Sequence, residues 1–377
     1  MGELALSIHA GWRNNEKIGT VFINNVRGKE IYSFEYEHEW LVKNKDLYFD
    51  PDIQPFMGRQ YLTEGKETYG FLQDISPDRW GRKLLQRKDS NLARNEGRAP
   101  YTLMPSDYLL GVQDKLRYGG IRIKLNDNYV DNSLNSPVPP FTRLRELEQA
   151  VRSLENNDPN NDEWLNMLIV PGSSLGGARP KANVIDNNGN LWIAKFPSRY
   201  DECNIGAWEY IASKLADKCY ISTNQVSFIK SGDKDIFLTK RFDRNGDARI
   251  HAASAMTLLS LTDGSDEGNY IKIADFIRAN CNDVSSNLEE LWRRMVFSVA
   301  INNTDDHLRN HSFLLQNDNS WSLSRVYDIN PNPFKSVSLD IDIGIKKNLM
   351  NLFEYAEFFN ISQSKAKDYI FFVASTE

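Results

Sequence analysis

The sequence predicts an α+β protein in which a mixed N-terminal domain precedes a C-terminal region of two lobes. Three observations indicate this arrangement. Short strand-like runs (GTVFINN, EIYSFEY and GGIRIKL) surround one helical stretch, PDRWGRKLLQRK, in residues 1–125. A glycine-rich loop, a β-hairpin, a helix and a strand then follow one another in residues 142–242. From residue 243 onward the apolar positions are mostly spaced as in helices.

The composition is that of a globular protein with more than one part. The chain has 377 residues, 41% of them hydrophobic, which exceeds the usual size of one domain and suffices for real cores. Its net charge of -6 lacks the basic surplus of a protein that lives on nucleic acid. The three cysteines, Cys203, Cys219 and Cys281, are far apart, so we expect them to be reduced. No stretch of about 18 apolar residues or export signal is visible. We therefore expect a cytoplasmic protein without a membrane span.

A polar, proline-rich segment marks a boundary in the chain. Residues 126–141, NDNYVDNSLNSPVPPF, show no apolar periodicity, so we interpret them as a linker. Residues 1–125 would form an accessory domain, 142–242 a mixed small lobe and 243–377 a mostly helical large lobe. Loop, hairpin, helix and strand is the order of the small lobe of a protein kinase, so we expect a protein-kinase-like two-lobed fold.

The segment SSLGGARPK, residues 173–181, is a candidate phosphate-binding loop. Its paired glycines, Gly176 and Gly177, let backbone N–H groups approach an anion without obstruction, and Lys181 follows them. The segment has neither the spacing of a Walker motif nor the GxGxxG spacing of ordinary kinases. A tight loop before a strand is the alternative interpretation.

The hairpin KANVIDNNGNLWIAK contributes a second lysine. Pairing Ile185 with Leu191 across the turn places Lys195 opposite Lys181, within one register step either way. Glu209 borders the apolar stripe of the next helix, from where it can reach Lys195 as in the lysine–glutamate pair of kinases. The alternatives are solvated surface lysines and an exposed helical glutamate.

The segment NNTDDHLRNHSFLL follows a predicted helix and has the spacing of a kinase catalytic loop. In such loops an aspartate base precedes a magnesium-binding asparagine by five residues, because both must face one phosphate from a short, rigid segment. Asp305 and Asn310 have this spacing. The alternative is a solvated acidic loop.

A second hairpin is expected to bring a further carboxylate to this loop. Pairing Gln316 with Trp321 sets Asn310 opposite Tyr327, beside Asp328. Neighbouring strands are about 4.8 Å apart, so we predict that Asn310 and Asp328 share one metal ion.

Two other features have competing interpretations. His307 and His311 are four residues apart, a spacing that can bind zinc on one helix face, but the glutamate of HExxH is missing and His311 begins a predicted strand. A basic run in the N-terminal region is either a solvated helix face or a patch for a partner or a DNA backbone. Its members are Arg79, Arg82, Lys83, Arg87 and Lys88.

Taken together, these segments resemble the HipA-like serine/threonine kinases, the toxin components of bacterial type II toxin–antitoxin systems. The resemblance runs through SSLGGARPKA, LWIAKFP, FLTKRFDR with RIHAASAMTLL, NNTDDHLRNHSFLL and YDINPNP, in family order. PDRWGRKLL and GVQDKLRYGGIRIKL match the accessory domain of the family. Two departures are the early end of the C-terminal helices and Arg179-Pro180, where the best-known member has Gln-Glu.

The resemblance implies the cofactors ATP and Mg²⁺ and a role for each site residue. Asp305 would be the catalytic base, and Asn310 and Asp328 would hold magnesium. Ser174, or its neighbour Ser173, would be autophosphorylated, making the chain a phosphoprotein. The implied nucleotide-binding residues are Gly176, Gly177, Ala178, Arg179, Lys181, Lys195, Glu209, Lys240, Arg241, Phe242, His307, Asn310 and Asp328.

The resemblance also implies partners. These are a small helix-turn-helix antitoxin similar to HipB, DNA reached mainly through that complex, and a protein substrate, which in the family is an aminoacyl-tRNA synthetase. The alternative is a kinase-shaped binding subunit that holds an antitoxin on operator DNA with weak catalysis or none. ATP-dependent autophosphorylation separates the two.

Overall fold

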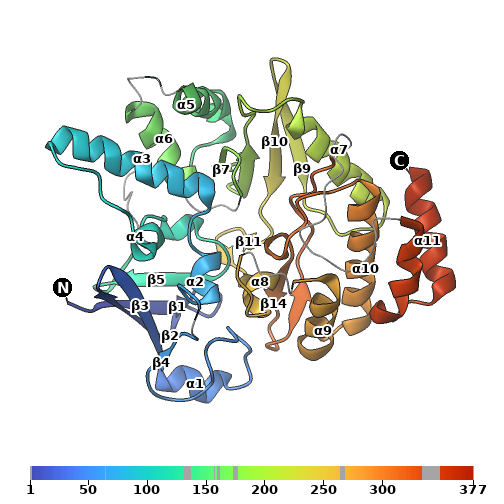
Figure 1. The fold of residues 1–377 in the computed structure, drawn as a ribbon, viewed down its shortest axis with the longest axis horizontal. Helices are drawn as coiled ribbons and strands as arrows, with labels where there is room; N and C mark the ends of the chain where they lie inside the picture. The colour runs from blue at the N-terminus through green and yellow to red at the C-terminus, as the bar shows by residue number, and fades with distance from the viewer. Residues whose placement is uncertain are drawn as a thin grey trace.

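The computed structural model confirms the α+β fold class (Figure 1). It describes residues 2–63, 65–130, 137–156, 158, 162–172, 177–263, 268–332 and 349–376. The strands of these described residues form four antiparallel sheets, and their longer helices lie mainly at the top left and the right of Figure 1.

The N-terminal region, residues 2–130, is built on a six-stranded sheet of order β4-β3-β2-β1-β5-β6. The turn between β2 and β3 has positive φ at both central residues, Arg27 and Gly28, which matches the twist of a tight hairpin. Leu6, Ile8 and Ala10 alternate along β1 and are fully buried, so one face of the sheet packs on a core. The strands are β1 (Leu4–Ala10), β2 (Glu16–Val26), β3 (Lys29–Tyr36), β4 (Gln60–Tyr61), β5 (Ile121–Leu125) and β6 (Asn128–Tyr129).

The longest helix described in this region, α3, is capped at both ends. The Asp78 side chain accepts a hydrogen bond from the Gly81 backbone at its start, and Gly97 ends it in the left-handed conformation with φ +66°. The helices here are α1 (His38–Asn44), α2 (Gly70–Asp74), α3 (Arg79–Glu96) and α4 (Pro105–Leu110), with the 3-10 turn η1 (Asp114–Leu116).

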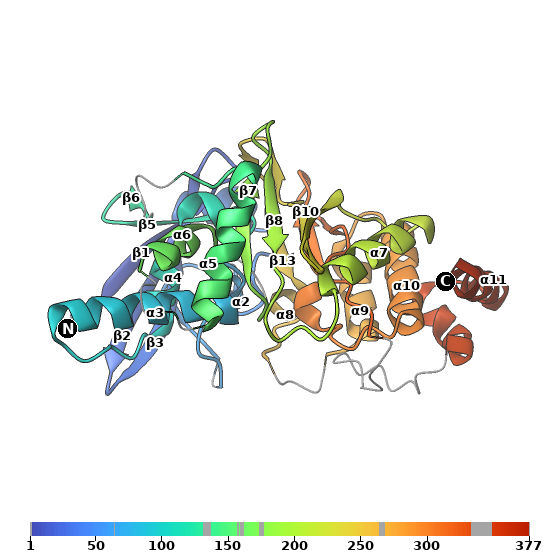
Figure 2. The ribbon, with the colours of Figure 1, turned by 90° about the horizontal axis from the view of Figure 1, so that it is seen from above.

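A second sheet, of order β7-β8-β10-β9, has helices on both sides. Figure 2 shows α5 and α6 on one side and α7 on the other. Trp80 and Leu84 of α3 belong to the same buried cluster as Val184 and Leu238 of this sheet, so the N-terminal region contributes to its core. The elements are β7 (Lys181–Ile185), β8 (Leu191–Lys195), β9 (Val226–Ser231), β10 (Lys234–Lys240), η2 (Phe141–Arg143), α5 (Leu144–Asn156), α6 (Asp162–Gly172) and α7 (Ile205–Lys218).

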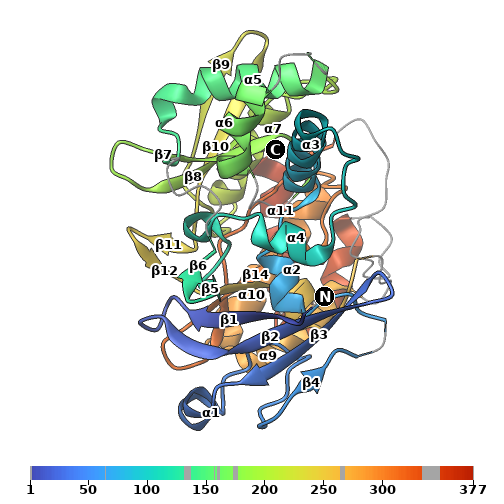
Figure 3. The same cartoon turned by 90° about the vertical axis from the view of Figure 1, so that its left-hand side faces the viewer.

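The remaining residues are mostly helical around a small sheet of order β13-β14-β15. Phe313 of this sheet and Trp292 of α10 belong to the same hydrophobic core as the N-terminal sheet. The N-terminal sheet lies at the opposite end of the molecule from β9 in Figure 3. These elements are β11 (Arg244–Asn245), β12 (Ala248–Arg249), β13 (Ala252–Ser254), α8 (Ala255–Leu258), α9 (Tyr270–Asn280), α10 (Val284–Ala300), η3 (Leu308–Asn310), β14 (Ser312–Leu315), β15 (Trp321–Leu323), η4 (Leu349–Phe359) and α11 (Gln363–Thr376).

Two expectations about the whole chain can be compared with the structure. Cys203, Cys219 and Cys281 are free thiols, as predicted. Among the described residues, no helix combines the length and apolar character needed to cross a membrane.

Candidate active site

The β7–β8 hairpin places two lysines side by side. Ile185 pairs with Leu191, and Lys181 pairs directly with Lys195, which confirms the predicted register. The turn is fixed by Asp186, whose carboxylate accepts hydrogen bonds from the backbone of residues 188 and 190 and from the indole of residue 192. Because side chains alternate along a strand, residues directly opposite each other project from the same face.

Lys195 is buried between two carboxylates. Its ammonium group lies 2.5 Å from Glu209 Oε1 of α7 and is also ion paired with Asp328. The predicted contact between Lys195 and Glu209 is therefore confirmed, and Asp328 joins them from a third segment. Burial alone lowers the pKa of Lys195, but the two negative charges outweigh burial and raise that pKa above its ordinary value.

Lys181 is held from the N-terminal region. Its ammonium group lies 3.6 Å from the carboxylate of Asp78, the N-cap of α3, and its carbonyl accepts a hydrogen bond from the indole of Trp80. Burial lowers the pKa of Lys181 and raises the pKa of Asp78 to about 6. Asp78 was not among the site residues expected from the sequence. An aspartate directly before a helical run was the signal for its position as an N-cap.

The glycine loop is described only from Gly177 onward, so Ser173, Ser174 and Gly176 lie outside the described residues. Gly177 has φ +100°, and a Cβ atom there would stand 2.6 Å from Lys181 Nζ. The backbone conformation at position 177 therefore favours glycine, and the flexible ammonium group of Lys181 lies directly beside it.

The two residues after Gly177 differ in their surroundings. Ala178 is exposed, whereas the guanidinium of Arg179 forms two hydrogen bonds with Asp201, at 2.5 and 2.8 Å. This bidentate pair ties the end of the loop to the segment between β8 and α7.

The loop after α10 carries an exposed carboxylate. The side chain of Asp305 is 66% exposed, and its carboxylate lies 3.7 Å from Nε2 of His307. The Asn310 side chain donates a hydrogen bond of 2.8 Å to the backbone carbonyl of Asp305. The five-residue spacing therefore closes a local turn, in which the amide nitrogen of Asn310 donates to the backbone. The amide oxygen of Asn310 is the atom suited to a metal ion.

Asp306, the neighbour of Asp305, is instead a buried structural residue. Its carboxylate accepts hydrogen bonds from the Tyr270 hydroxyl and from His311 Nε2, the latter at 2.9 Å. Burial alone raises the pKa of Asp306, but these partners outweigh burial and lower that pKa. His307 and His311 flank the 3-10 turn η3 with extended backbones, so they do not share the helix face that zinc binding required.

The predicted register of the second hairpin is wrong by one residue. Trp321 pairs with Leu315 and not with Gln316, whose backbone N–H instead bonds to the carbonyl of Ser320. Asn319, with φ +68°, closes this turn one residue earlier than expected.

This correction changes how Asn310 and Asp328 are connected. Asn310 lies in η3 and not in a strand, so it has no partner across a ladder. The Tyr327 hydroxyl instead donates a 2.6 Å hydrogen bond to the carbonyl of Arg309, which joins the two segments. Asp328 has φ +55°, a conformation that costs a non-glycine residue about 1 kcal/mol or more and that concentrates at functional sites.

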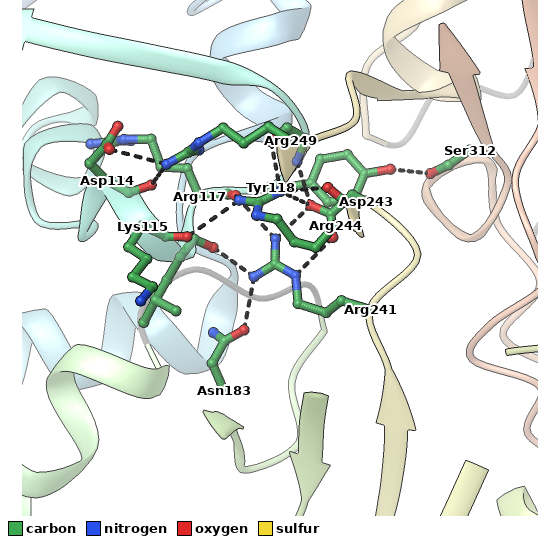
Figure 4. A network of polar contacts seen from close by, with 12 residues as sticks. Asp114, Lys115, Arg117, Tyr118, Asn183, Arg241, Asp243, Arg244, Arg249 and Ser312 are labelled. Carbon is green, nitrogen blue, oxygen red and sulfur yellow. Dashed lines mark hydrogen bonds and ion pairs between the residues drawn. The ribbon is translucent and has the colours of Figure 1, made fainter. Parts of the chain in front are cut away.

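Residues 240–242, at the end of β10, were expected to lie along the nucleotide base. Lys240 and Arg241 donate backbone hydrogen bonds to Gln225 and Leu191, and the Phe242 ring lies 5.4 Å from the Tyr327 ring. The Arg241 side chain points into the buried network of Figure 4. All five of its N–H groups are bonded there, so none remains for a nucleotide. Their partners are Asp243 (twice), Asn183 and the carbonyls of Leu116 and Arg117.

The site thus brings Lys181, Lys195, Glu209 and Asp328 together, with Asp305, His307 and Asn310 on the adjoining loop. Burial alone raises the pKa of Asp328. The positive charge of Lys195 outweighs burial, with smaller contributions from Lys181 and His307, so the pKa of Asp328 lies below its ordinary value. Two ammonium groups near a glycine loop are suited to phosphates, and the oxygens of Asp328 and Asn310 are ligands that magnesium prefers.

The chain is similar to several known proteins. The model of the HipA-like C-terminal domain matches residues 173–375. A Haemophilus influenzae protein named "Putative kinase" is 26% identical over 190 residues, covering 44% of this chain and 55% of that protein. A second "Putative kinase", from Sinorhizobium fredii, is 25% identical over 211 residues, covering 48% and 51%. The chain spans about half the length of these curated relatives.

A solved structure has the same fold over nearly the whole chain. It is that of the Shewanella oneidensis toxin–antitoxin system HipA, HipB and its operator DNA, with a TM-score of 0.66. The match covers 98% of this chain and 88% of the other, at 17% sequence identity.

Proposed function

Because the chain belongs to the HipA-like C-terminal domain family, we propose that it is an ATP- and magnesium-dependent protein serine/threonine kinase. The observation that carries the proposal is the convergence of Lys195, Glu209 and Asp328 from three separate segments. Protein kinases use such a lysine on the phosphates, a helical glutamate to hold it and an aspartate for magnesium. The names of the two curated relatives support the same activity.

In this proposal the nucleotide lies between the glycine loop and residues 240–242 at the end of β10. Residues 176–181 contact its phosphates together with Lys195, and residues 240–242 line its base through their backbone and the Phe242 ring. The Arg241 guanidinium holds that segment in place. His307 lies beside the phosphates, near Asp328.

Magnesium, when bound, supplies positive charge that neutralises the phosphoryl group during transfer. We assign its protein ligands to Asp328 and Asn310. Asp305 is the base: its exposed carboxylate can accept the proton of an incoming serine or threonine hydroxyl. In this scheme the ion pair between Lys195 and Asp328 separates when ATP and magnesium bind, because Lys195 then contacts phosphate and Asp328 contacts the metal ion.

The proposal extends to regulation and partners. Ser174, or Ser173, receives the γ-phosphoryl group of ATP by autophosphorylation, with ADP as the leaving group, which places negative charge where ATP phosphates bind. The partner is a HipB-like helix-turn-helix antitoxin that also contacts DNA, as the composition of the Shewanella oneidensis complex supports. The substrate is a cytosolic protein, with an aminoacyl-tRNA synthetase as the first candidate. The proposal also includes the division into an accessory domain, a linker and two lobes, with the accessory domain extended to residue 130 by β6.

The decisive experiment follows labelled phosphate from ATP. Purified protein is incubated with magnesium and γ-labelled ATP, alone and with a phosphatase-treated cell extract, and labelled residues are identified by mass spectrometry. We expect label on Ser174 or Ser173 and on at least one extract protein, and its loss with a chelator. Ser173→Ala and Ser174→Ala, tested separately, assign the modified residue.

A folded protein that transfers no label to itself or to the extract would overturn the proposal. The alternative of a binding subunit then stands. It predicts antitoxin binding that does not change when ATP is added.

A further inference from the structure

A chain of three hydroxyl groups connects the N-terminal region to the loop that carries the proposed metal ligands. The Tyr118 hydroxyl donates to Ser312 Oγ at 2.7 Å (Figure 4), and Ser312 Oγ lies 2.5 Å from the Tyr327 hydroxyl. The Tyr327 hydroxyl donates to the carbonyl of Arg309 at 2.6 Å. Each hydroxyl has one proton, so the chain has one direction: Tyr118 to Ser312, Ser312 to Tyr327, and Tyr327 to the backbone.

The last hydrogen bond of this chain joins two residues that lie beside the proposed metal ligands. Tyr327 directly precedes Asp328, and Arg309 directly precedes Asn310. The hydrogen bond between Tyr327 and the Arg309 carbonyl therefore fixes the distance between the two ligand segments, which no strand pairing does.

The middle of the hydroxyl chain is buried. Ser312 is 1% exposed, and tyrosine hydroxyls ordinarily have a pKa of about 10. Both tyrosines therefore remain protonated donors at physiological pH. Hydrogen bonds in such surroundings are stronger than in water and polarise one another.

Tyr118 is itself held in place by the charged network of Figure 4. The Asp243 carboxylate accepts a 2.7 Å hydrogen bond from the Gly119 backbone, and Arg244 donates to the Gly119 carbonyl at 2.9 Å. Gly119 has φ +64°, and a Cβ atom there would stand 2.8 Å from the carbonyl oxygen of Ala252. The backbone around Tyr118 therefore has little freedom to move.

We propose that Tyr118 is a positioning residue, contributed by the N-terminal region, that sets the spacing of the magnesium ligands Asn310 and Asp328. This inference rests on the proposed function. Without the Tyr118 hydroxyl, Ser312 loses its donor and is free to turn its own proton away from Tyr327. The hydrogen bond from Tyr327 to the Arg309 carbonyl then weakens. Asn310 and Asp328 are no longer held at the spacing that magnesium requires, so magnesium binds more weakly.

The substitution Tyr118→Phe tests the proposal because it removes one hydroxyl and keeps the ring that packs edge-on against Phe242, with centroids 6.2 Å apart. It also leaves a second contact from the N-terminal region intact, the 3.1 Å hydrogen bond from the Arg309 side chain to Gln73. We expect the magnesium concentration that half-saturates ATP binding to rise about tenfold, equivalent to about 1.4 kcal/mol. ATP binding without magnesium should stay unchanged.

Two further variants make the measurement specific. Ser312→Ala should give a similar shift, and the double variant should add little, because both changes break the same chain. Tyr369→Phe is the matched control, since it removes a tyrosine hydroxyl that donates at 2.7 Å to the Cys219 carbonyl, remote from the site. The control should leave the magnesium requirement at the wild-type value.

The outcomes separate this inference from the proposed function. If the wild type shows no magnesium-dependent binding of ATP, both are wrong. If the wild type shows it and Tyr118→Phe has the same magnesium requirement as Tyr369→Phe, only the positioning role of Tyr118 is wrong.

Discussion

Lys181 and Lys195 lie directly opposite each other on β7 and β8, yet their ammonium groups have different partners. Lys181 faces Asp78 of the N-terminal region, whereas Lys195 faces Glu209 and Asp328. Each lysine lowers the cost of its burial through a carboxylate, because an unpaired ammonium group in a dry site is strongly unfavourable. The structure thus holds two positive charges ready beside the glycine loop.

The first prediction concerns Lys195. Lys195→Met removes the ammonium group and leaves the carboxylates of Glu209 and Asp328 without it. We expect ATP to bind at least about 30-fold more weakly, a loss of about 2 kcal/mol, because its phosphates lose a buried charged partner. Calorimetric titration with ATP and magnesium measures this. Lys230→Met, on an exposed position of β9, is the control and should bind as the wild type does. Equal affinities for the two variants would remove Lys195 from the phosphate site.

The second prediction distinguishes two neighbouring aspartates. Asp305→Asn should bind ATP normally but transfer phosphate about 100-fold to 10,000-fold more slowly, because a general base is lost. Asp306→Asn should instead lower the free energy of unfolding by about 1.5 to 3 kcal/mol, since it weakens charged hydrogen bonds with Tyr270 and His311. Transfer rates and urea unfolding measure both effects. If the phosphate-transfer rate of Asp305→Asn stays within about tenfold of the wild-type rate, Asp305 is not the general base.

The third prediction concerns the metal ligand Asp328. ATP with magnesium at 100 times its dissociation constant stabilises a protein by about 2.7 kcal/mol. In Asp328→Ala we expect this magnesium-dependent stabilisation to disappear, as measured by thermal unfolding with ATP in the presence and absence of magnesium. Asp318→Ala, on the exposed turn of the second hairpin, is the control. A full magnesium effect in Asp328→Ala would show that the ion is held elsewhere.

The fourth prediction is a dependence of stability on pH. His251 stacks on Trp12 with centroids 4.2 Å apart, and neither ring nitrogen has a hydrogen-bond partner among the described residues. Burial lowers the pKa of His251 from 6.5 to about 3. The unfolded chain therefore binds a proton that the folded chain does not, so stability is full above pH 6.5 and is lost as the pH falls toward 3.

The substitution His251→Phe isolates this contribution. From pH 7 to pH 5 the wild type should lose about 2 kcal/mol more free energy of unfolding than the variant, because only the wild type has this titrating ring. Urea unfolding of both proteins at the two pH values gives the comparison. Parallel losses in the two proteins would show that the ring is protonated in the folded state as well.

The parts of the site that the sequence predicted correctly depend on neighbours along the chain. The pairing of Lys181 with Lys195 follows from the turn residues around Asp186 and from alternation along two short strands. The Lys195–Glu209 contact adds only one helix to that hairpin. The roles of Asp305 and Asn310 as base and metal ligand remain predictions, although the hydrogen bond between them shows how their spacing is used.

The second hairpin shows where this kind of reasoning fails. The turn NDNS is compatible with more than one register, and a left-handed Asn319 selected the one that the sequence pattern did not favour. A one-residue shift moves every side chain to the other face of a strand. The link between Asn310 and Asp328 therefore passes through the Tyr327 side chain and not through a ladder.

The sequence by itself determined the α+β class, the register of the first hairpin and the free state of the cysteines, because propensity, turn chemistry and residue type act over short stretches of chain. Only the tertiary structure decided the pairing of Lys181 with Asp78, the enclosure of Arg241 and the contact of Tyr118 with Ser312. Long stretches of chain separate the residues that meet: Arg241 and Leu116 are 125 positions apart, and Tyr118 and Ser312 are 194 positions apart. Such contacts form only when the packing of two hydrophobic cores brings the N-terminal region against the rest of the chain, and no local pattern encodes that packing.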